Sequence, residues 1–260
     1  MTTDILILTV YFICVAYVLY QIALAQEAQR DDQVDIHLNQ EALMAQLAAQ
    51  LQQQGRAEAF AAEVLPSGDK PLDGSPFLRL QLPNPRQPEA DVETIDMQVL
   101  PQGMRPLQPP IKALDVRILN RSQTIQVYID WDRSSITRLN NQAQRVIRLS
   151  NTMPNELFQP QVQSVINPGQ LFSVAVTSES AFGRSGEAQS LEPQGPLIDL
   201  EKAIKLPQPL QIYSLKLLVW LKPVTAPDED AVRLLLPFMF DLEVLPDLPA
   251  VPILRWIVSR

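Results

Sequence analysis

Over residues 111–245 apolar and polar residues alternate with a period of two, and this pattern limits the fold more than any other feature of the chain. Leu114, Val116 and Ile118, for example, are separated by charged residues. Successive side chains of a β-strand point to opposite faces, so the alternation predicts strands with one buried face. Similar runs cover residues 125–131, 143–149, 171–177, 210–221 and 232–244. Without a helical pattern between them, they predict an antiparallel β-sandwich over residues 111–246.

Residues 65–110 form a proline-rich segment. Ten prolines lie within it, which excludes helix over most of its length. Residues 77–82 and 93–99 nevertheless alternate between apolar and polar side chains. We predict two short strands there, at a sheet edge, where proline is tolerated.

Residues 26–64 are rich in Ala, Gln, Glu and Leu and contain no proline, which favours helix. We predict a helical stalk with an amphipathic helix that Asn39 caps and Gly55 ends. Its apolar stripe recurs every four residues, at Leu43, Leu47 and Leu51. We interpret this stripe as a candidate interaction surface, with packing against the protein's own domain as the alternative.

Residues 5–25 contain no charge, and as a helix they would be about 30 Å long, the thickness of the hydrocarbon core of a bilayer. The sequence therefore predicts a single-pass transmembrane anchor over residues 1–25. One competing interpretation is a cleaved signal peptide: residues 23–25 resemble a cleavage site, but residues 1–4 lack the usual Lys or Arg. The other is a buried core helix, which the charges at residues 30–32 make less favourable.

The positive-inside rule relates the orientation of an anchor to the basic residues beside it. Arg30 is the one basic residue close to the uncharged stretch, and it lies on the C-terminal side. The rule therefore leans towards a soluble domain on the cytoplasmic side, with an exported domain as the alternative.

The composition offers little material for common catalytic sites. Cys14, the single cysteine, lies in the predicted anchor, and His37, the single histidine, follows it. Zinc sites built on thiolate or imidazole and histidine-dependent triads are therefore not expected. The net charge of −8, without any run of Lys or Arg, argues against nucleic acid as a partner. We predict a protein that is not an enzyme and that holds no cofactor or metal.

Asp130 and Asp132 are the one candidate for an acidic site. They flank Trp131 in a predicted strand, which places both carboxylates on the same side. Two such groups can bind a hard cation or act as acid and base. Because Ser134 and Ser135 follow where the strand meets a turn, hydrogen bonds to the local backbone are the favoured interpretation.

Trp220 and Trp256 are further candidates for an interaction surface. Trp220 alternates with Leu221 and is predicted on the opposite face, beside Leu218; an exposed face of this kind binds partners, and core packing is the alternative. Trp256 belongs to an apolar tail over residues 247–260 that is too short to span a bilayer. Covering the sandwich, lying at the membrane surface and docking a partner are the roles left open for this tail.

Residues 127–136 read VYIDWDRSSI, a strand that ends in W-D-x-S-S, and Asn167-Pro168-Gly169 precedes a later strand. In these features the chain resembles bacterial membrane-tethered proteins of unknown function with an immunoglobulin-like β-sandwich. The resemblance implies a fold and supplies no catalytic motif. The disulfide of true immunoglobulin domains is absent, because the only cysteine lies elsewhere.

These observations lead us to expect a non-enzymatic, membrane-anchored interaction, scaffold or assembly protein of a membrane complex. Its partners would be the lipid bilayer and another protein. One alternative is a module that binds a lipid or small apolar ligand, which requires a cavity on the order of a few hundred Å³. A second alternative is a carboxylate-dependent hydrolase, which requires Asp130 and Asp132 to be buried together in a cleft.

Overall fold

The computed structural model divides the chain into two compact units. The first, here the α1 unit, comprises residues 1–35, 105–108 and 243–260, and the second, the β unit, comprises residues 36–104 and 109–242. The residues that the structure describes are 2–28, 34–57, 60–66, 75–84, 92–103, 107, 110–138, 142–149, 159–185, 190–199, 202–203, 205–207, 212–227 and 231–244.

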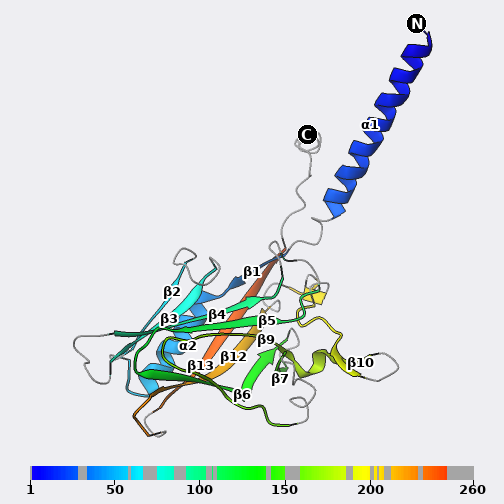
Figure 1. The fold of residues 1–260 in the computed structure, drawn as a ribbon. Coiled ribbons are helices and arrows are strands. Elements are labelled where there is room, and N and C mark those ends of the chain that lie inside the picture. The colour runs from blue at the N-terminus through cyan, green and yellow to red at the C-terminus, as the bar shows by residue number, and fades with distance from the viewer. Residues whose placement is uncertain are drawn as a thin grey trace. The chain divides into compact units, whose positions relative to one another are not determined.

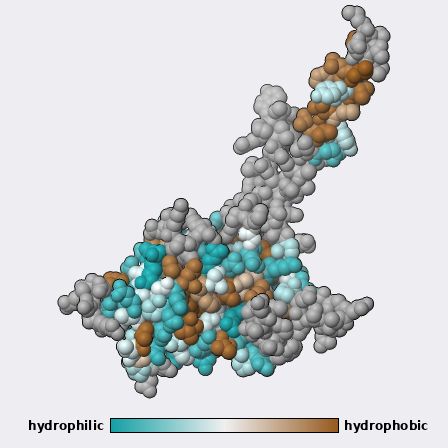
Figure 2. Space-filling model, in the orientation of Figure 1, coloured by the Kyte–Doolittle hydropathy of each residue, from teal (hydrophilic) through white to brown (hydrophobic). Residues whose placement is uncertain are grey.

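Helix α1 (Thr2–Ala28) dominates the described part of the α1 unit (Figure 1). Its side chains are described at residue 5 and residues 7–21, and they are mostly apolar and exposed, as the brown surface in Figure 2 shows. None of the helices in the described part of the chain combines the length and apolarity needed to cross a bilayer. The predicted transmembrane anchor over residues 1–25 is therefore not supported.

The prediction of a continuous helical stalk over residues 26–64 is wrong in part. Its helical centre is α2 (Gln40–Gln53), but strands β1 (Val34–Leu38) and β2 (Ala61–Leu65) lie on either side of it. Both strands pair with neighbours far along the chain, β1 with β13 and β2 with β3. In β2, which reads AAEVL, this pairing outweighs a local preference for helix, which is a weak determinant of structure. In β1, which reads VDIHL, apolar and polar residues alternate as they do in a strand.

The predicted ends of α2 are confirmed. The Asn39 side chain accepts a hydrogen bond from the backbone N–H of Ala42 at 3.0 Å, as an N-cap does. At the other end Gly55 adopts a left-handed conformation with φ 67°. The N–H groups of Gly55 and Arg56 donate to the carbonyls of Gln52 and Leu51, which completes a Schellman motif.

The β unit is built on one curled sheet of eleven strands, in the order β1-β13-β12-β6-β7-β9-β5-β4-β3-β2, with β8 paired to β6 (Figure 1). Its other strands are β3 (Phe77–Pro83), β4 (Val92–Pro101), β5 (Leu114–Asn120), β6 (Ile125–Thr137), β7 (Ala143–Arg148), β8 (Ser164–Ile166), β9 (Leu171–Ser178), β12 (Ile212–Pro223) and β13 (Val232–Val244). A 3-10 turn η1 (Glu179–Ala181) leads into a separate hairpin of β10 (Phe182–Ser185) and β11 (Ser190–Pro193).

Strand β7 joins two halves of this sheet. Its first residues pair with β6, for example Ala143 with Thr137, and its last residues pair with β9, for example Ile147 with Thr177. The expectation of a mainly β, antiparallel fold is thus confirmed, but the strands form a single curled sheet and not the separate sandwich predicted over residues 111–246. The two strands predicted in the proline-rich segment are also present, as β3 and β4, and they belong to the same sheet as the strands beyond residue 111. Their predicted position at a sheet edge is wrong, because β3 lies between β2 and β4, and β4 lies between β3 and β5.

Apolar side chains from the inner faces of both halves form the core of the β unit. Ile129 and Trp131 of β6, Val219 of β12, and Ile95 and Met97 of β4 are at most 1 % exposed. These positions follow the alternation of the sequence, because the inward side of a strand takes every second residue.

Helix α2 covers the core beside two strands that lie towards opposite ends of the sheet order. On one side the Gln50 side chain bonds both the N–H and the carbonyl of Leu235 in β13, at 2.8 and 2.7 Å, and Gln54 donates to the Arg233 carbonyl at 2.7 Å. On the other side α2 packs near β2. The two glutamine side chains thus occupy backbone groups of β13 that a further strand would otherwise pair with.

Candidate functional site

Asp130 and Asp132 lie in β6 at an irregularity that breaks its alternation. Ser135 pairs with Lys216 and Asp130 with Leu218, so four residues of β6 lie opposite one residue of β12. The strand bends at such a bulge, and successive side chains no longer take opposite faces in turn. Asp130 is 8 % exposed, whereas Asp132 is exposed.

The Asp130 carboxylate is engaged by residues just after it in the chain. Its Oδ1 accepts the backbone N–H of Arg133 at 3.1 Å, and the Arg133 Nε lies 3.7 Å from its Oδ2. The Ser134 hydroxyl donates to the Asp130 carbonyl at 2.6 Å. This is the local turn chemistry that the serines after the strand favour.

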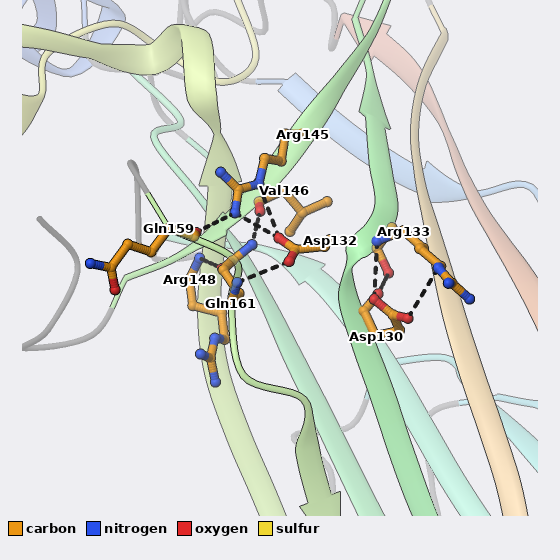
Figure 3. A network of polar contacts seen from close by, with 9 residues as sticks. Asp130, Asp132, Arg133, Arg145, Val146, Arg148, Gln159 and Gln161 are labelled. Atoms are coloured by element: carbon orange, nitrogen blue, oxygen red, sulfur yellow. Dashed lines mark hydrogen bonds and ion pairs between the residues drawn. The ribbon is translucent and has the colours of Figure 1, made fainter. Parts of the chain in front are cut away.

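The Asp132 carboxylate turns towards β7 and the segment before β8. Its Oδ1 accepts hydrogen bonds from Arg145 at 2.6 and 3.1 Å, and its Oδ2 accepts the backbone N–H of Gln161 at 2.9 Å. Figure 3 shows Asp130 and Asp132 directed at these separate partners. The structure therefore does not bring the two carboxylates together on one substrate or one cation.

The apolar stripe of α2, which the sequence suggested as a candidate interaction surface, lies in the core. Leu43 and Leu47 are fully buried, and Leu51 is 4 % exposed. The prediction that these leucines form an interaction surface is wrong, because the inner face of their own sheet already covers them; the alternative, packing within the domain, is what the structure has.

Trp220 lies on the outer face of β12, opposite the buried Leu221, as its position in the alternation predicts. It pairs across the strands with Tyr128 of β6 and Arg233 of β13, whose guanidinium carbon lies 4.7 Å from the centroid of the indole ring. Half-exposed apolar side chains lie close by, and we define the outer patch as Tyr128, Val165, Leu218, Trp220 and Leu235. Trp256 and the tail over residues 247–260 lie outside the described residues.

Asp199 and Tyr213 form a half-buried polar contact. The Tyr213 hydroxyl accepts the backbone N–H of Asp199 at 3.0 Å, and Lys202 Nζ lies 2.8 Å from the Asp199 carboxylate. Burial raises the pKa of Tyr213 to about 12. Burial also acts to raise the pKa of Asp199, but the hydrogen bonds and charge of Lys202 outweigh it and hold that pKa below its usual value.

A cavity of about 560 Å³, here the end cavity, lies beside the C-terminal end of α2. Its walls come from the residues after the helix and from the ends of strands β3, β6 and β12; Arg56, Phe60, Leu82, Ile125 and Leu221 are among them. A second hollow of about 330 Å³ lies between α2 and β2, and Phe60 lines both.

Arg56 and Phe60 were not predicted from the sequence as site residues. The cavity walls come from four segments that are far apart in the chain, so no local spacing relates them. The one signal nearby was Gly55, which marked the end of α2 without indicating what the following residues line.

Within the described residues, no group of three or more His, Cys, Asp or Glu side chains is placed to hold a metal ion. The resemblance to membrane-tethered immunoglobulin-like proteins stays a prediction. Comparisons with protein-family models, with curated proteins and with solved structures found no match to this chain.

Proposed function

We propose that this protein is a non-enzymatic interaction protein that α1 holds at a lipid membrane. The observation that carries the proposal is the exposure of α1. Its apolar residues include the consecutive run Val10, Tyr11, Phe12 and Ile13, each at least 52 % exposed. Four consecutive residues point around the whole circumference of a helix. A helix that is apolar on all sides is stable only in apolar surroundings, and membrane lipid supplies them to an uncharged segment.

The β unit supplies the interaction surface in this proposal. The outer patch combines Trp220 with Arg233 and with Leu235, which is 38 % exposed, and aromatic residues with Arg are enriched where proteins bind one another. The proposed partner is another protein of the same membrane. The hydrolase alternative is not favoured, because Asp130 and Asp132 each bind their own arginine and backbone N–H.

The single cysteine of the chain permits a direct test of the lipid contact. Cys14 is exposed in the middle of α1, so a bulky maleimide-polyethylene glycol reagent reaches it if α1 lies in water. We expect no modification in intact native membranes and complete modification after dissolution in dodecyl sulfate. Modification of Cys14 in intact membranes would show that lipid does not cover α1.

A matched control uses the variant Cys14→Ser, Val162→Cys, which moves the thiol to a side chain of the β unit that is 77 % exposed. The new thiol is expected to react in unsealed membrane fragments, where the reagent reaches both sides of the membrane. In sealed inside-out vesicles it should react as well if the β unit lies on the cytoplasmic side, the side that the positive-inside rule favours. Protection there would place the β unit on the opposite side.

The proposed partner surface is tested by photo-crosslinking in native membranes. A photoreactive amino acid at Leu235, in the outer patch, is expected to capture one defined protein. The same amino acid at Leu171, which is 63 % exposed in the other half of the sheet, is the control. Absence of any adduct from Leu235, or the same adducts from both positions, would contradict a docking role for the outer patch.

A further inference from the structure

We propose that the end cavity binds the hydrocarbon chain of a single-chain carboxylate amphiphile, such as a long-chain fatty acid, and that Arg56 pairs with its carboxylate. This site lies wholly in the β unit and does not rest on the proposed contact between α1 and lipid.

The size and the walls of the end cavity suit an apolar chain. Its volume of about 560 Å³ falls within the range of roughly 300–1,000 Å³ that is typical of ligand sites. Leu82, Ile125, Leu221 and Val232 line it and are themselves at most 4 % exposed, so the strand ends that carry them are held by the core. Walls fixed in this way form a site that exists before a ligand enters it.

The charge of the lining selects the head group. Among the lining residues that the structure describes, Arg56 is the only charged one, and Thr225 adds a hydroxyl. Arg56 is half-buried and forms no ion pair with a carboxylate among the described residues. A guanidinium group binds a carboxylate through two parallel hydrogen bonds. An apolar cavity with one cation among its described lining residues therefore favours a ligand with an apolar chain and one carboxylate over a small hydrated anion.

Phe60 sets the depth of the site. It lines the end cavity on one side and the hollow between α2 and β2 on the other. Removing its ring with Phe60→Ala would join the two spaces. The chain length of the bound amphiphile is therefore expected to be limited by Phe60.

The test uses the full chain in native membranes and a palmitate analogue with a photoreactive diazirine at the end of its chain. After irradiation, mass spectrometry maps the labelled residues. We expect label on peptides that contain Phe60, Leu82 or Leu221, and displacement of the probe by palmitate but not by its methyl ester. Label confined to α1, or equal displacement by the ester, would overturn the proposal.

Two pairs of variants sharpen the test. Arg56→Gln should lower labelling of the cavity peptides roughly tenfold, the loss expected for a charge-assisted contact, whereas Lys205→Gln removes an exposed charge elsewhere and should change nothing. Ala226→Trp, at a half-buried lining position, should block labelling, and Val162→Trp, on an exposed loop, should not. The far-UV circular dichroism of each variant checks its fold. A folded Ala226→Trp protein that labels like the wild type would also overturn the proposal.

Discussion

Helices α1 and α2 differ in whether their apolar side chains are buried. In α2 three leucines form one stripe, the sheet buries them, and Asn39 and Gly55 complete the two ends. In α1 the apolar side chains lie on all sides and are exposed. An apolar stripe on one side of a helix can thus be buried against the sheet beside it, whereas apolar residues around the whole circumference of a helix cannot be buried by one sheet face.

The largest expected difference between the helices comes from removing one leucine from each. Leu43→Ala in α2 empties space in the core and should lower the free energy of unfolding of the β unit by about 2–5 kcal/mol. Leu8→Ala in α1, at a residue 56 % exposed, should change it by about 0.5 kcal/mol or less. Urea unfolding of the full chain in mild detergent, followed by tryptophan fluorescence, measures both. Equal effects would break the contrast between the helices.

Alkaline pH offers the next largest effect. The pKa of Tyr213 is about 12 in the folded state, above its ordinary value of 10.0, so folding favours the protonated hydroxyl. This stabilisation is fully present below about pH 10 and is lost as the pH rises to about 12, with a total of up to about 3 kcal/mol. Urea unfolding across this pH range should show the loss in the wild type and a smaller loss in Tyr213→Phe. The control Tyr17→Phe, in α1, should keep the full loss; if Tyr213→Phe keeps it too, another group is responsible.

A third prediction concerns the C-terminal end of α2. Gly55→Ala places a side chain at φ 67°, where nothing lies within 4 Å of the added carbon, so the penalty is conformational rather than a clash. The free energy of unfolding should fall by about 1–2 kcal/mol. Gly55→Asn should lose less, since asparagine tolerates left-handed backbone. Equal losses measured by urea unfolding would point to a different cause.

The smallest expected effect comes from the glutamines that bind β13. Gln50→Ala removes two hydrogen bonds to Leu235 and should lower the free energy of unfolding by about 1 kcal/mol. Gln53→Ala, at an exposed position of the same helix, is the control and should have almost no effect. The unpaired backbone of β13 should also make Gln50→Ala associate, which light scattering detects. Equal results for Gln50→Ala and Gln53→Ala would contradict the idea that the glutamines of α2 cover the unpaired backbone of β13.

Features that depend on neighbouring residues could be predicted from the sequence. The alternation predicted the strands and the outer position of Trp220, and Asn39 and Gly55 predicted the ends of α2. Features that depend on distant partners could not. Residues 61–65 have the composition of a helix but pair as a strand with β3. Residues 34–38 are different, because Val34, Ile36 and Leu38 alternate with polar residues in a strand pattern that the predicted stalk overlooked.

The candidate site shows the same limit. The alternation places Asp130 and Asp132 on one side of a strand, but the bulge opposite Lys216 and Leu218 sends them to different partners. The register of β6 against β12 determines which partners the two carboxylates contact, and the sequence of β6 alone does not specify that register. For Arg56 and Phe60 the neighbouring sequence holds no sign that four distant segments meet around them.

The contact between Gln50 and Leu235 joins residues 185 positions apart. During translation α2 therefore leaves the ribosome long before the strand that its glutamine side chains bind. The helix is capped by local contacts and can form early. Its leucines, however, can be buried only when the sheet is complete, which requires that β13 has emerged. Since domains fold as units during synthesis, the β unit should acquire protease resistance in one late step, after residue 244 has cleared the exit tunnel.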